Sequence, residues 1–453
     1  MDRDEHPLAW LLHRHGWSAT RYLARLDPIH HRLGYGHIAL DQRKRVSRWI
    51  TKGVTPEEGV QRAMAILHKI PEEEITTRPW PDWLRLACLT ERDLLQAEWT
   101  AQATTELLDH ITATGGASVD RRAFLVVAGV TPALAQAATA QPATAQARGR
   151  RIGADTPALF EQALSVLRRQ DDQLGSGQVH ATARAQLRLV TSTLKTASYT
   201  EAVGRRLYAA AAEAARSCGW TAHDSGQHAL AEEFYLLALR AATAADDPVA
   251  TANTCAFWAI TRYSGGDPHG AAYLAEDGLR YAGRFDSPRL EAVLHARRAR
   301  AHAKAGEHRA AARAQDAAFA AYDRARSPEE EPDAVYWVNL GELHSWAASN
   351  ATNLGDPARA LAHFEAIPAA HQAEGYDTGA YPRAAALRLA RTAEAHIARG
   401  DIDAAAAAAH QAVDHLGGVS SARGSSTLAD LRGQLALHQD TGTVRDFFHR
   451  TSA

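Results

Sequence analysis

The stretch from Cys218 to Ala231 reads Cys-Gly-Trp-Thr-Ala-His-Asp-Ser-Gly-Gln-His-Ala-Leu-Ala and carries small residues at three fixed places. Gly226 lies near its centre, with Gly219 seven residues before it and Ala231 five residues after it. Small residues on both sides of a turn let two antiparallel helices approach each other closely. The stretch therefore predicts a helix that ends near Gly226 and a second helix that packs back against the first.

The same spacing recurs along the second half of the chain. Four more turn glycines, Gly266, Gly306, Gly355 and Gly400, follow at intervals of 40, 40, 49 and 45 residues. Each has alanine five residues after it and Gly or Ala seven residues before it. Such a period predicts a stacked array of helical hairpins. We expect this array in residues 155–453, with one or two degenerate repeats in 156–217 and a capping helix over 425–448.

The composition predicts an all-α fold. Alanine is abundant from about residue 200 onward, and alternating Val, Ile and Thr are nearly absent. The length of 453 residues suggests two or three domains. No apolar run approaches the length of a membrane span, and Cys88, Cys218 and Cys255 match no zinc motif. We therefore expect a cytoplasmic protein without a membrane segment.

The net charge of −2 conceals an asymmetry between the two ends of the chain. Residues 1–70 hold 12 Lys and Arg against 7 Asp and Glu, which leaves 38 and 45 for the remainder. The N-terminal segment is thus +5 and the rest −7. A small basic segment on a mildly acidic body is the pattern expected when one end meets a polyanion such as DNA.

A short basic helix is predicted between Asp41 and Gly53. Asp41 can accept hydrogen bonds from the first backbone N–H groups, and Gly53 can close the helix in the left-handed conformation. Val46, Trp49 and Ile50 fall on one apolar face, so we expect Trp49 to be a core residue. The opposite face is cationic, and it is either a functional surface or simply a solvated one.

Other helices are expected on either side of this one. Residues 8–15 form a first helix that ends at Gly16, and Ser18 caps a second helix over 19–26, which Asp27-Pro28 should stop. After Gly53, the run Thr55-Pro-Glu-Glu58 predicts a further helix with Thr55 as its N-cap. Four helices would then occupy the first 70 residues.

The segment from Pro28 to Leu40 contains His30, His31 and His37. Imidazole is a common metal ligand, but no cysteine lies near and no helical i, i+4 pair is formed. Contacts with phosphate, or plain solvation, are the favoured interpretations, and no metal site is predicted.

Residues 8–70 resemble lambda-repressor-like (Xre-type) helix-turn-helix domains, most specifically at Val46-Ser-Arg-Trp49, Gly53 and Thr55-Pro56. The Pro28 to Leu40 segment is longer than the tight turn of that family. The resemblance implies that the helix after Asp41 enters the major groove of double-stranded DNA, and two half-sites read together imply a homodimer. The residues expected to contact DNA are Gln42, Arg43, Lys44, Ser47, Arg48 and Lys52.

A helical connector with a flexible linker is expected between the two domains, over residues 71–154. Pro79-Trp-Pro-Asp-Trp83 suggests a rigid hinge with two aromatic anchors, followed by a helix from about Leu84 to Thr114. Arg121-Arg122 before an apolar run looks like a twin-arginine export signal. Its position 120 residues into the chain favours a short packed helix instead. The Ala, Thr and Gln run from about Ala135 to Arg151 reads as a mobile linker.

The hairpin array resembles tetratricopeptide repeats, although its period exceeds the usual 34 residues. Together, the two ends resemble actinobacterial regulators that join a helix-turn-helix to a tetratricopeptide array and control development or secondary metabolism. In this resemblance the array dimerises and senses a peptide, a small molecule or a protein partner. A tetratricopeptide scaffold without DNA binding and a secreted protein are the alternatives.

The first helix of each hairpin is expected to line the concave wall of the array. Residues 13, 10, 6 and 3 positions before each turn glycine share one helical face. They are equally consistent with packing against a neighbouring hairpin or a partner subunit. No catalytic motif or cofactor site is recognisable, so no enzyme activity is expected. The residues expected to bind a ligand or partner are Arg216, Trp220, Asn253, Tyr263, Arg300, Glu342 and Ser349.

Overall fold

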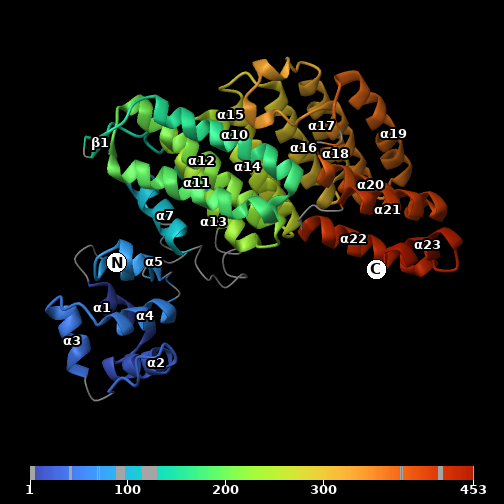
Figure 1. Cartoon of the computed structure of the whole chain (residues 1–453). Coiled ribbons are helices and arrows are strands. Elements are labelled where there is room, and N and C mark those ends of the chain that lie inside the picture. Colours follow the sequence, from blue (N-terminus) through green and yellow to red (C-terminus); the bar gives the residue numbers. More distant parts are fainter. Residues whose placement is uncertain are drawn as a thin grey trace. The chain divides into compact units, whose positions relative to one another are not determined.

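The computed structural model describes residues 6–39, 43–68, 70, 72–87, 97–114, 130–147, 149–377, 379, 381–416 and 422–451. The chain divides into two compact units, Met1–Glu98 with Glu106–Asp120 and Trp99–Thr105 with Arg121–Ala453 (Figure 1). These units divide the chain differently from the predicted boundaries at residues 70 and 154. Helices dominate both units, which confirms the all-α prediction. No helix in the described residues combines the length and the apolar character that a membrane crossing needs.

The first unit is a cluster of short helices around one apolar core. Trp49 is 3% exposed and packs with Tyr22, Leu23 and Met64, as the apolar face predicts. Gly16 ends the first helix with φ 59°, and the Ser18 hydroxyl caps the second by accepting from the Arg21 N–H. The elements are α1 (Pro7–His15), α2 (Ala19–Arg32), α3 (Arg43–Thr51), α4 (Glu58–Leu67), α5 (Glu73–Thr77) and η1 (Asp82–Ala87).

The prediction that Asp27-Pro28 stops the second helix is wrong, because α2 continues to Arg32 with Pro28 inside it. A proline in a helix interior costs about 3 kcal/mol. Burial of the last turn offsets this cost, since Ile29 packs on the core and His30 is 8% exposed. The Asp27 carboxylate instead accepts the Ile38 N–H at 2.6 Å and ties the following loop to α2.

The predicted N-cap at Thr55 is also wrong, because α4 begins at Glu58 with Glu57 at the cap position and no capping side chain. Both neighbouring groups are engaged elsewhere. The Pro56 carbonyl accepts from the Gln61 amide, and Glu57 forms an ion pair with Arg45 at 2.9 Å. The start of α4 is therefore set by tertiary contacts rather than by a capping box.

The histidines after Asp27 have distinct environments. His30 is buried and its Nδ1 lies 2.8 Å from the Gly36 carbonyl oxygen. His31 and His37 are exposed and stack, with ring centroids 4.1 Å apart, and His37 also contacts Asp27. No group of His, Cys, Asp and Glu in the described part of the chain could hold a metal ion.

The helix expected in the connector is shorter than predicted. A single helix from Leu84 to Thr114 is not formed, because residues 97–100 are not helical and α7 spans only Ala101–Thr114. Of the predicted aromatic anchors, Trp83 is fully buried and Trp80 packs against it at 5.8 Å. The Arg121-Arg122 segment lies outside the described residues.

The predicted mobile linker is instead attached to the array. It contains the end of α9 (Val130–Ala137) and β1 (Arg150–Arg151), which pairs with β2 (Ala197–Ser198). The Gln146 amide donates to the Ala197 carbonyl at 2.8 Å, and the Ala143 N–H donates to Ala244. Local composition could not reveal this attachment, because the hydrogen-bond partners lie about 50 and 100 residues away in the chain.

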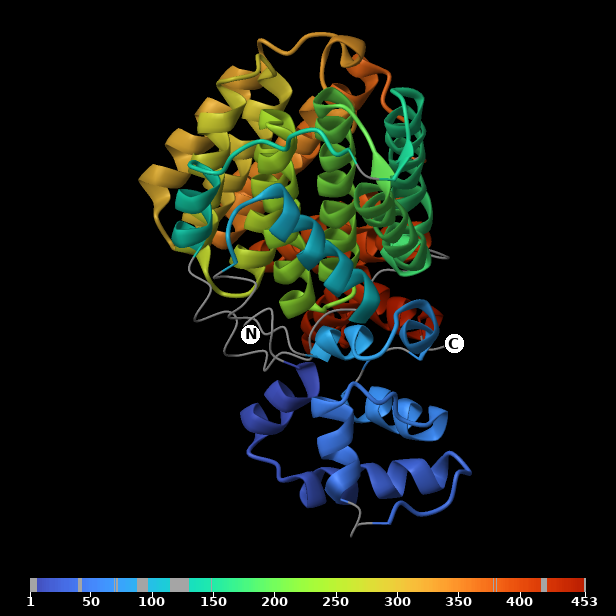
Figure 2. The same cartoon turned by 90° about the vertical axis from the view of Figure 1, so that its left-hand side faces the viewer.

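The second unit is a tetratricopeptide-like solenoid whose helical hairpins follow one another in chain order (Figures 1 and 2). An additional first hairpin precedes the five predicted ones and accounts for the degenerate repeat. The hairpins are α10 (Asp155–Leu174) with α11 (Ser176–Thr196), α12 (Glu201–Asp224) with α13 (His228–Ala245), α14 (Pro248–Ser264) with α15 (Pro268–Ala282), α16 (Pro288–Lys304) with α17 (His308–Tyr322), α18 (Leu340–Asn353) with α19 (Pro357–Glu374), and α20 (Pro382–Arg399) with α21 (Ile402–Leu416).

The five turn glycines lie where the spacing predicts. Each has a positive φ, between 74° and 91°, at the end of the first helix of its hairpin. The alanines five residues later are all at most 2% exposed. At Gly219 a Cβ would lie 2.8 Å from the Tyr235 ring, so this position needs glycine for the helices to approach. The predicted single capping helix is two helices, α22 (Ala422–Leu435) and α23 (Gly442–Arg450).

Candidate ligand-binding cavity

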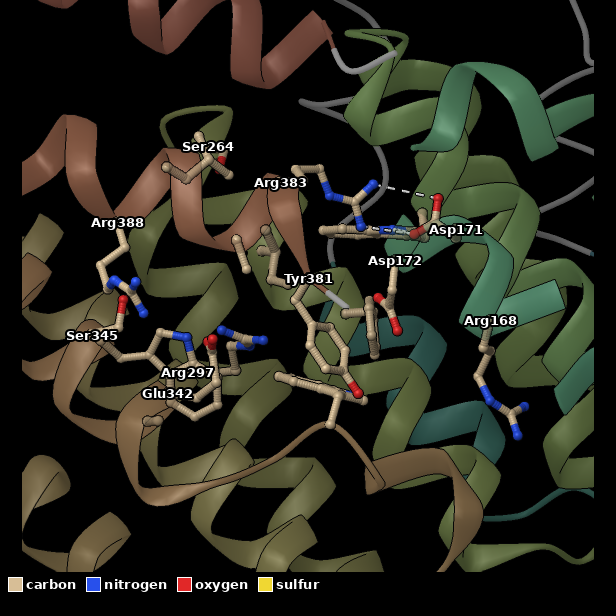
Figure 3. Close-up of a pocket in the computed structure, with 18 of the residues that line it drawn as sticks. Arg168, Asp171, Asp172, Ser264, Arg297, Glu342, Ser345, Tyr381, Arg383 and Arg388 are labelled. Atoms are coloured by element: carbon tan, nitrogen blue, oxygen red, sulfur yellow. Dashed lines mark hydrogen bonds and ion pairs between the residues drawn. The ribbon is translucent and has the colours of Figure 1, made fainter. Parts of the chain in front are cut away.

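A buried ion pair joins the first and the last hairpins of the array. The Arg383 guanidinium on α20 donates to Asp171 on α10 at 2.8 Å and lies 3.7 Å from Asp224 on α12 (Figure 3). Asp171 also accepts from the Ser176 hydroxyl and from the Trp220 indole N–H. The array therefore curves back on itself, so that its first and last hairpins meet.

Neighbouring arginines favour the charged form of two buried carboxylates, Asp171 and Glu213. Burial by itself would raise the pKa of Asp171, but the charge of Arg383 and three hydrogen bonds lower it overall. The same balance acts on Glu213 of α12. Burial by itself would raise its pKa, but the charges and hydrogen bonds of Arg216 and Arg168 lower the pKa to about 2. These pairs are structural, since each charge has a defined partner.

The curved array surrounds a partly open cavity of about 520 Å³. Its walls come from α10 and α11, from the first helix of each later hairpin and from α22, together with Ala334, Tyr336, Trp337, Tyr376 and Tyr381. This volume is in the range of small-molecule sites. First helices of the hairpins thus supply most of the cavity wall, to which α11 and α22 also contribute.

Aromatic side chains form one continuous part of the wall. The Trp220 ring meets Phe257 edge-on at 5.3 Å, Phe257 meets Trp337 at 6.2 Å, and Trp337 meets Trp346 at 5.9 Å. Such rings offer a large apolar surface with a few polar edges. The remaining aromatic residues of the wall are Tyr263, Tyr336, Tyr376 and Tyr381.

Asp172 is an acid of the cavity wall with an altered pKa. Burial raises the pKa of Asp172 to about 6, against a hydrogen bond that it accepts from the Tyr336 hydroxyl. It lies near Asp171 and Tyr381 in Figure 3. Its protonation therefore changes near neutral pH, which makes it a candidate for a polar contact with a ligand.

A basic part of the wall comes from α16 and α20. Arg297, Arg300 and Lys304 lie on α16, and Arg388 and Arg391 lie on α20. Burial and the neighbouring Arg391 lower the pKa of Arg300 to about 9, and burial also lowers the pKa of Arg388. Figure 3 shows Arg297 and Arg388 near Glu342 and Ser345.

The cavity brings together six of the seven residues predicted to bind a ligand, namely Arg216, Trp220, Tyr263, Arg300, Glu342 and Ser349. Their role in binding stays a prediction. Asn253 is the exception: it is 2% exposed, and on α14 the wall begins one turn later at Phe257. The position six residues before the turn glycine reaches the cavity in the hairpins of Gly226, Gly266, Gly306 and Gly355, whereas the position thirteen residues before it, where Asn253 lies, does so only at Glu342 among these four.

Several wall residues were missed. The same count before Gly400 would have indicated α20, where Leu387 lies thirteen residues before the glycine and lines the cavity. Arg383 lies before the positions counted from Gly400, and Asp171 lies in the first hairpin, which has none of the five turn glycines. No local pattern pairs them.

The predicted DNA-contacting face of α3 is exposed. Lys44, Ser47, Arg48 and the following Lys52 are all accessible, while Val46 and Trp49 are buried. Gln42 lies outside the described residues, as does the side chain of Arg43. Contact of these residues with DNA stays a prediction.

No protein-family model matches the chain, and no curated protein sequence matches it. Among solved structures, the chain is similar to a signal transduction ATPase with numerous domains (STAND) that has a tetratricopeptide repeat sensor, from Pyrococcus horikoshii. The identity is 9%, and the similarity covers 89% of this chain and 67% of that chain with a TM-score of 0.34. A likeness at this level carries no functional argument.

Proposed function

We propose that this protein is a DNA-binding transcriptional regulator whose repeat domain binds an effector in the cavity of the array. The observation that carries the proposal is the exposed basic face of α3 above a buried Val46 and Trp49 seam. A helix held rigidly by its apolar side can present Lys44, Ser47 and Arg48 to base edges and phosphates. The cavity supplies a separate place at which an effector can act.

The resemblance of the sequence supports the wider setting. In this proposal the protein is a cytoplasmic bacterial regulator of development or secondary metabolism that acts without enzyme activity. We propose that it binds DNA as a homodimer, because one small module supplies little affinity and two linked modules supply much more. An effector can change DNA binding only by the difference in its affinity for two states of the protein.

A salt-dependent mobility-shift assay on genomic fragments tests DNA binding. Replacing both Lys44 and Arg48 by Ala should abolish specific retention, since each good base contact contributes about 1–3 kcal/mol of discrimination. The matched control is Arg313→Ala with Arg399→Ala, which removes two exposed cations from the array. Wild-type retention that falls steeply with salt is expected.

Equal retention by both double variants would remove α3 from DNA binding. Absence of retention by the wild-type protein at low salt would leave a tetratricopeptide-like interaction protein without DNA binding. Circular dichroism and thermal unfolding of each variant exclude loss of fold as the cause.

A further inference from the structure

Five cations of the cavity wall have no carboxylate partner. No carboxylate oxygen of the described residues lies within 4.0 Å of a side-chain nitrogen of these cations, which are Arg297, Arg300, Lys304, Arg388 and Arg391. The other arginines of the same cavity differ in this respect. Their partners are carboxylates: Arg168 and Arg216 pair with Glu213, and Arg383 pairs with Asp171.

Two of these arginines, Arg300 and Arg391, contact the same neutral residue, Ser349. Arg300 donates to the Ser349 carbonyl at 2.6 Å, and Arg391 donates to the Ser349 hydroxyl at 2.7 Å. Both guanidinium groups thus lie beside Ser349 with further N–H donors to satisfy. Arg297 is 7% exposed, rests over the Trp346 ring at 4.7 Å, and has a buried Nε without a hydrogen-bond partner.

The acids around this group form no ion pair with its five cations, although the charge of Glu342 raises the pKa of Arg388 and that of Glu394 raises the pKa of Arg300. Glu394, one turn after Arg391, is close enough for Arg391 and Arg300 to oppose the rise that burial causes in its pKa, but it forms no ion pair with them. Glu342 and Asp430 also line the cavity. Of the two other acids of the wall, Asp171 pairs with Arg383, and Asp172 accepts from Tyr336 and has a raised pKa.

Crowding cations in a partly buried place without ion-pair partners is unfavourable: Arg297 is buried, Arg300, Arg388 and Arg391 are half-buried, and Lys304 lies at the exposed edge. Burial and mutual repulsion lower the pKa of Arg300 and of Lys304. A bound anion would remove the penalty, and a guanidinium group is suited to it because its planar fork matches carboxylate and phosphate oxygens.

We propose that the cavity binds a small organic anion, with a carboxylate or phosphate group held by Arg300 and Arg391 and with an apolar planar body lying against the aromatic wall. Arg297 and Arg388 add positive charge around the anionic group. The body would face Trp220 and Trp337, on the wall that Phe257 completes. The cavity volume of about 520 Å³ favours a small molecule. This inference rests on the proposed role of the cavity as the effector site.

Two fluorescent probes that differ by one charge test the inference on the full-length protein. 8-Anilinonaphthalene-1-sulfonate carries an anionic group on a planar apolar body, and N-phenyl-1-naphthylamine is its uncharged counterpart. The wild-type protein should bind the anionic probe more tightly. Arg300→Gln with Arg391→Gln should weaken the anionic probe by about tenfold or more, as loss of a charge-assisted hydrogen bond implies.

The same variant should leave the neutral probe almost unchanged, which also shows that the cavity keeps its shape. Arg313→Gln with Arg399→Gln is the matched control, and it should change neither affinity. Arg388→Gln is a milder second variant that should weaken only the anionic probe. Competition by phenyl phosphate and by benzoate then shows whether phosphate or carboxylate is preferred.

Equal affinity of the wild-type protein for both probes, or equal losses of both in the variants, would overturn the anion inference. Binding of the neutral probe alone would overturn it too, but would leave the cavity as a site for an uncharged effector. Failure of both probes to bind would reject the cavity as an effector site as well. The mobility-shift assay tests DNA binding independently of all these outcomes.

Discussion

Arg383 and Asp171 lie 212 residues apart in the chain, yet their side chains form a buried ion pair with 2.8 Å between Nη2 and Oδ2. The pair joins the first hairpin of the array to the last one, at the edge of the cavity. Arg383 contacts two carboxylates, because Asp224 also lies 3.7 Å from its guanidinium group. The shape of the cavity thus depends on a contact between the two ends of the array.

Replacing Arg383 by Met should destabilise the array strongly. The change leaves Asp171 and Asp224 buried without their cation, and breaking a buried pair in this way costs about 3–5 kcal/mol. Urea unfolding measures the loss. The control is Arg206→Met, which removes the exposed pair with Glu161 and should cost about 1 kcal/mol or less. Similar costs for the two variants would contradict a structural role of the Arg383 pair.

The pH dependence of stability should change when Asp172 becomes Asn. The pKa of Asp172 rises from 3.8 to about 6 on folding, so the folded state binds more protons between these values. This acid therefore lowers stability as pH rises from 3.8 to about 6, and the penalty persists above that. Asp172→Asn should remove this decline, as measured by thermal unfolding across that range.

Glu213→Gln should act with the opposite sign. Its pKa falls from 4.5 to about 2 on folding, so Glu213 contributes stability that is present above 4.5 and is lost as pH falls toward 2. The variant should be less stable at neutral pH and should lose less stability on acidification. Parallel pH profiles for the Asp172 and Glu213 variants would contradict the different environments of these two acids.

Trp49→Ala should unfold the first unit rather than weaken DNA contacts alone. Trp49 is 3% exposed in the core, and truncating a buried tryptophan costs about 3–5 kcal/mol. Tryptophan fluorescence and proteolysis of the first unit report its fold. Leu33→Ala, at a side chain 37% exposed, should be nearly neutral. A folded Trp49→Ala protein that has lost only DNA affinity would reassign this residue to the DNA interface.

Two glycine-to-alanine changes should have opposite signs. At Gly219 a new Cβ would lie 2.8 Å from the Tyr235 ring, and overpacking of this kind costs about 1–3 kcal/mol. At Gly433 on the exposed side of α22 nothing lies within 4 Å, so alanine should stabilise by up to about 1 kcal/mol through helix propensity. Chemical denaturation compares the two. Stabilisation at Gly219 would show that the helices separate to accept a methyl group.

The sequence by itself determined the features that depend on residues close together in the chain. The turn at Gly226 and the small residues around it indicated the hairpins, because glycine conformation and helix contact act over a few residues. The Val46 and Trp49 face indicated the burial of α3 for the same reason. The count from each turn glycine led to six residues that line the cavity, since residues three or four positions apart share one face of a helix.

Only the tertiary structure decided what depends on distant residues. The pairing of Arg383 with Asp171 follows from the curvature accumulated over the whole array, to which each hairpin adds a small rotation. The position of Asn253 outside the cavity and the attachment of Gln146 to Ala197 likewise depend on how helices tilt and where strands meet. The five cations on α16 and α20 lack carboxylate partners because the fold, and not their spacing, determines which charges become neighbours.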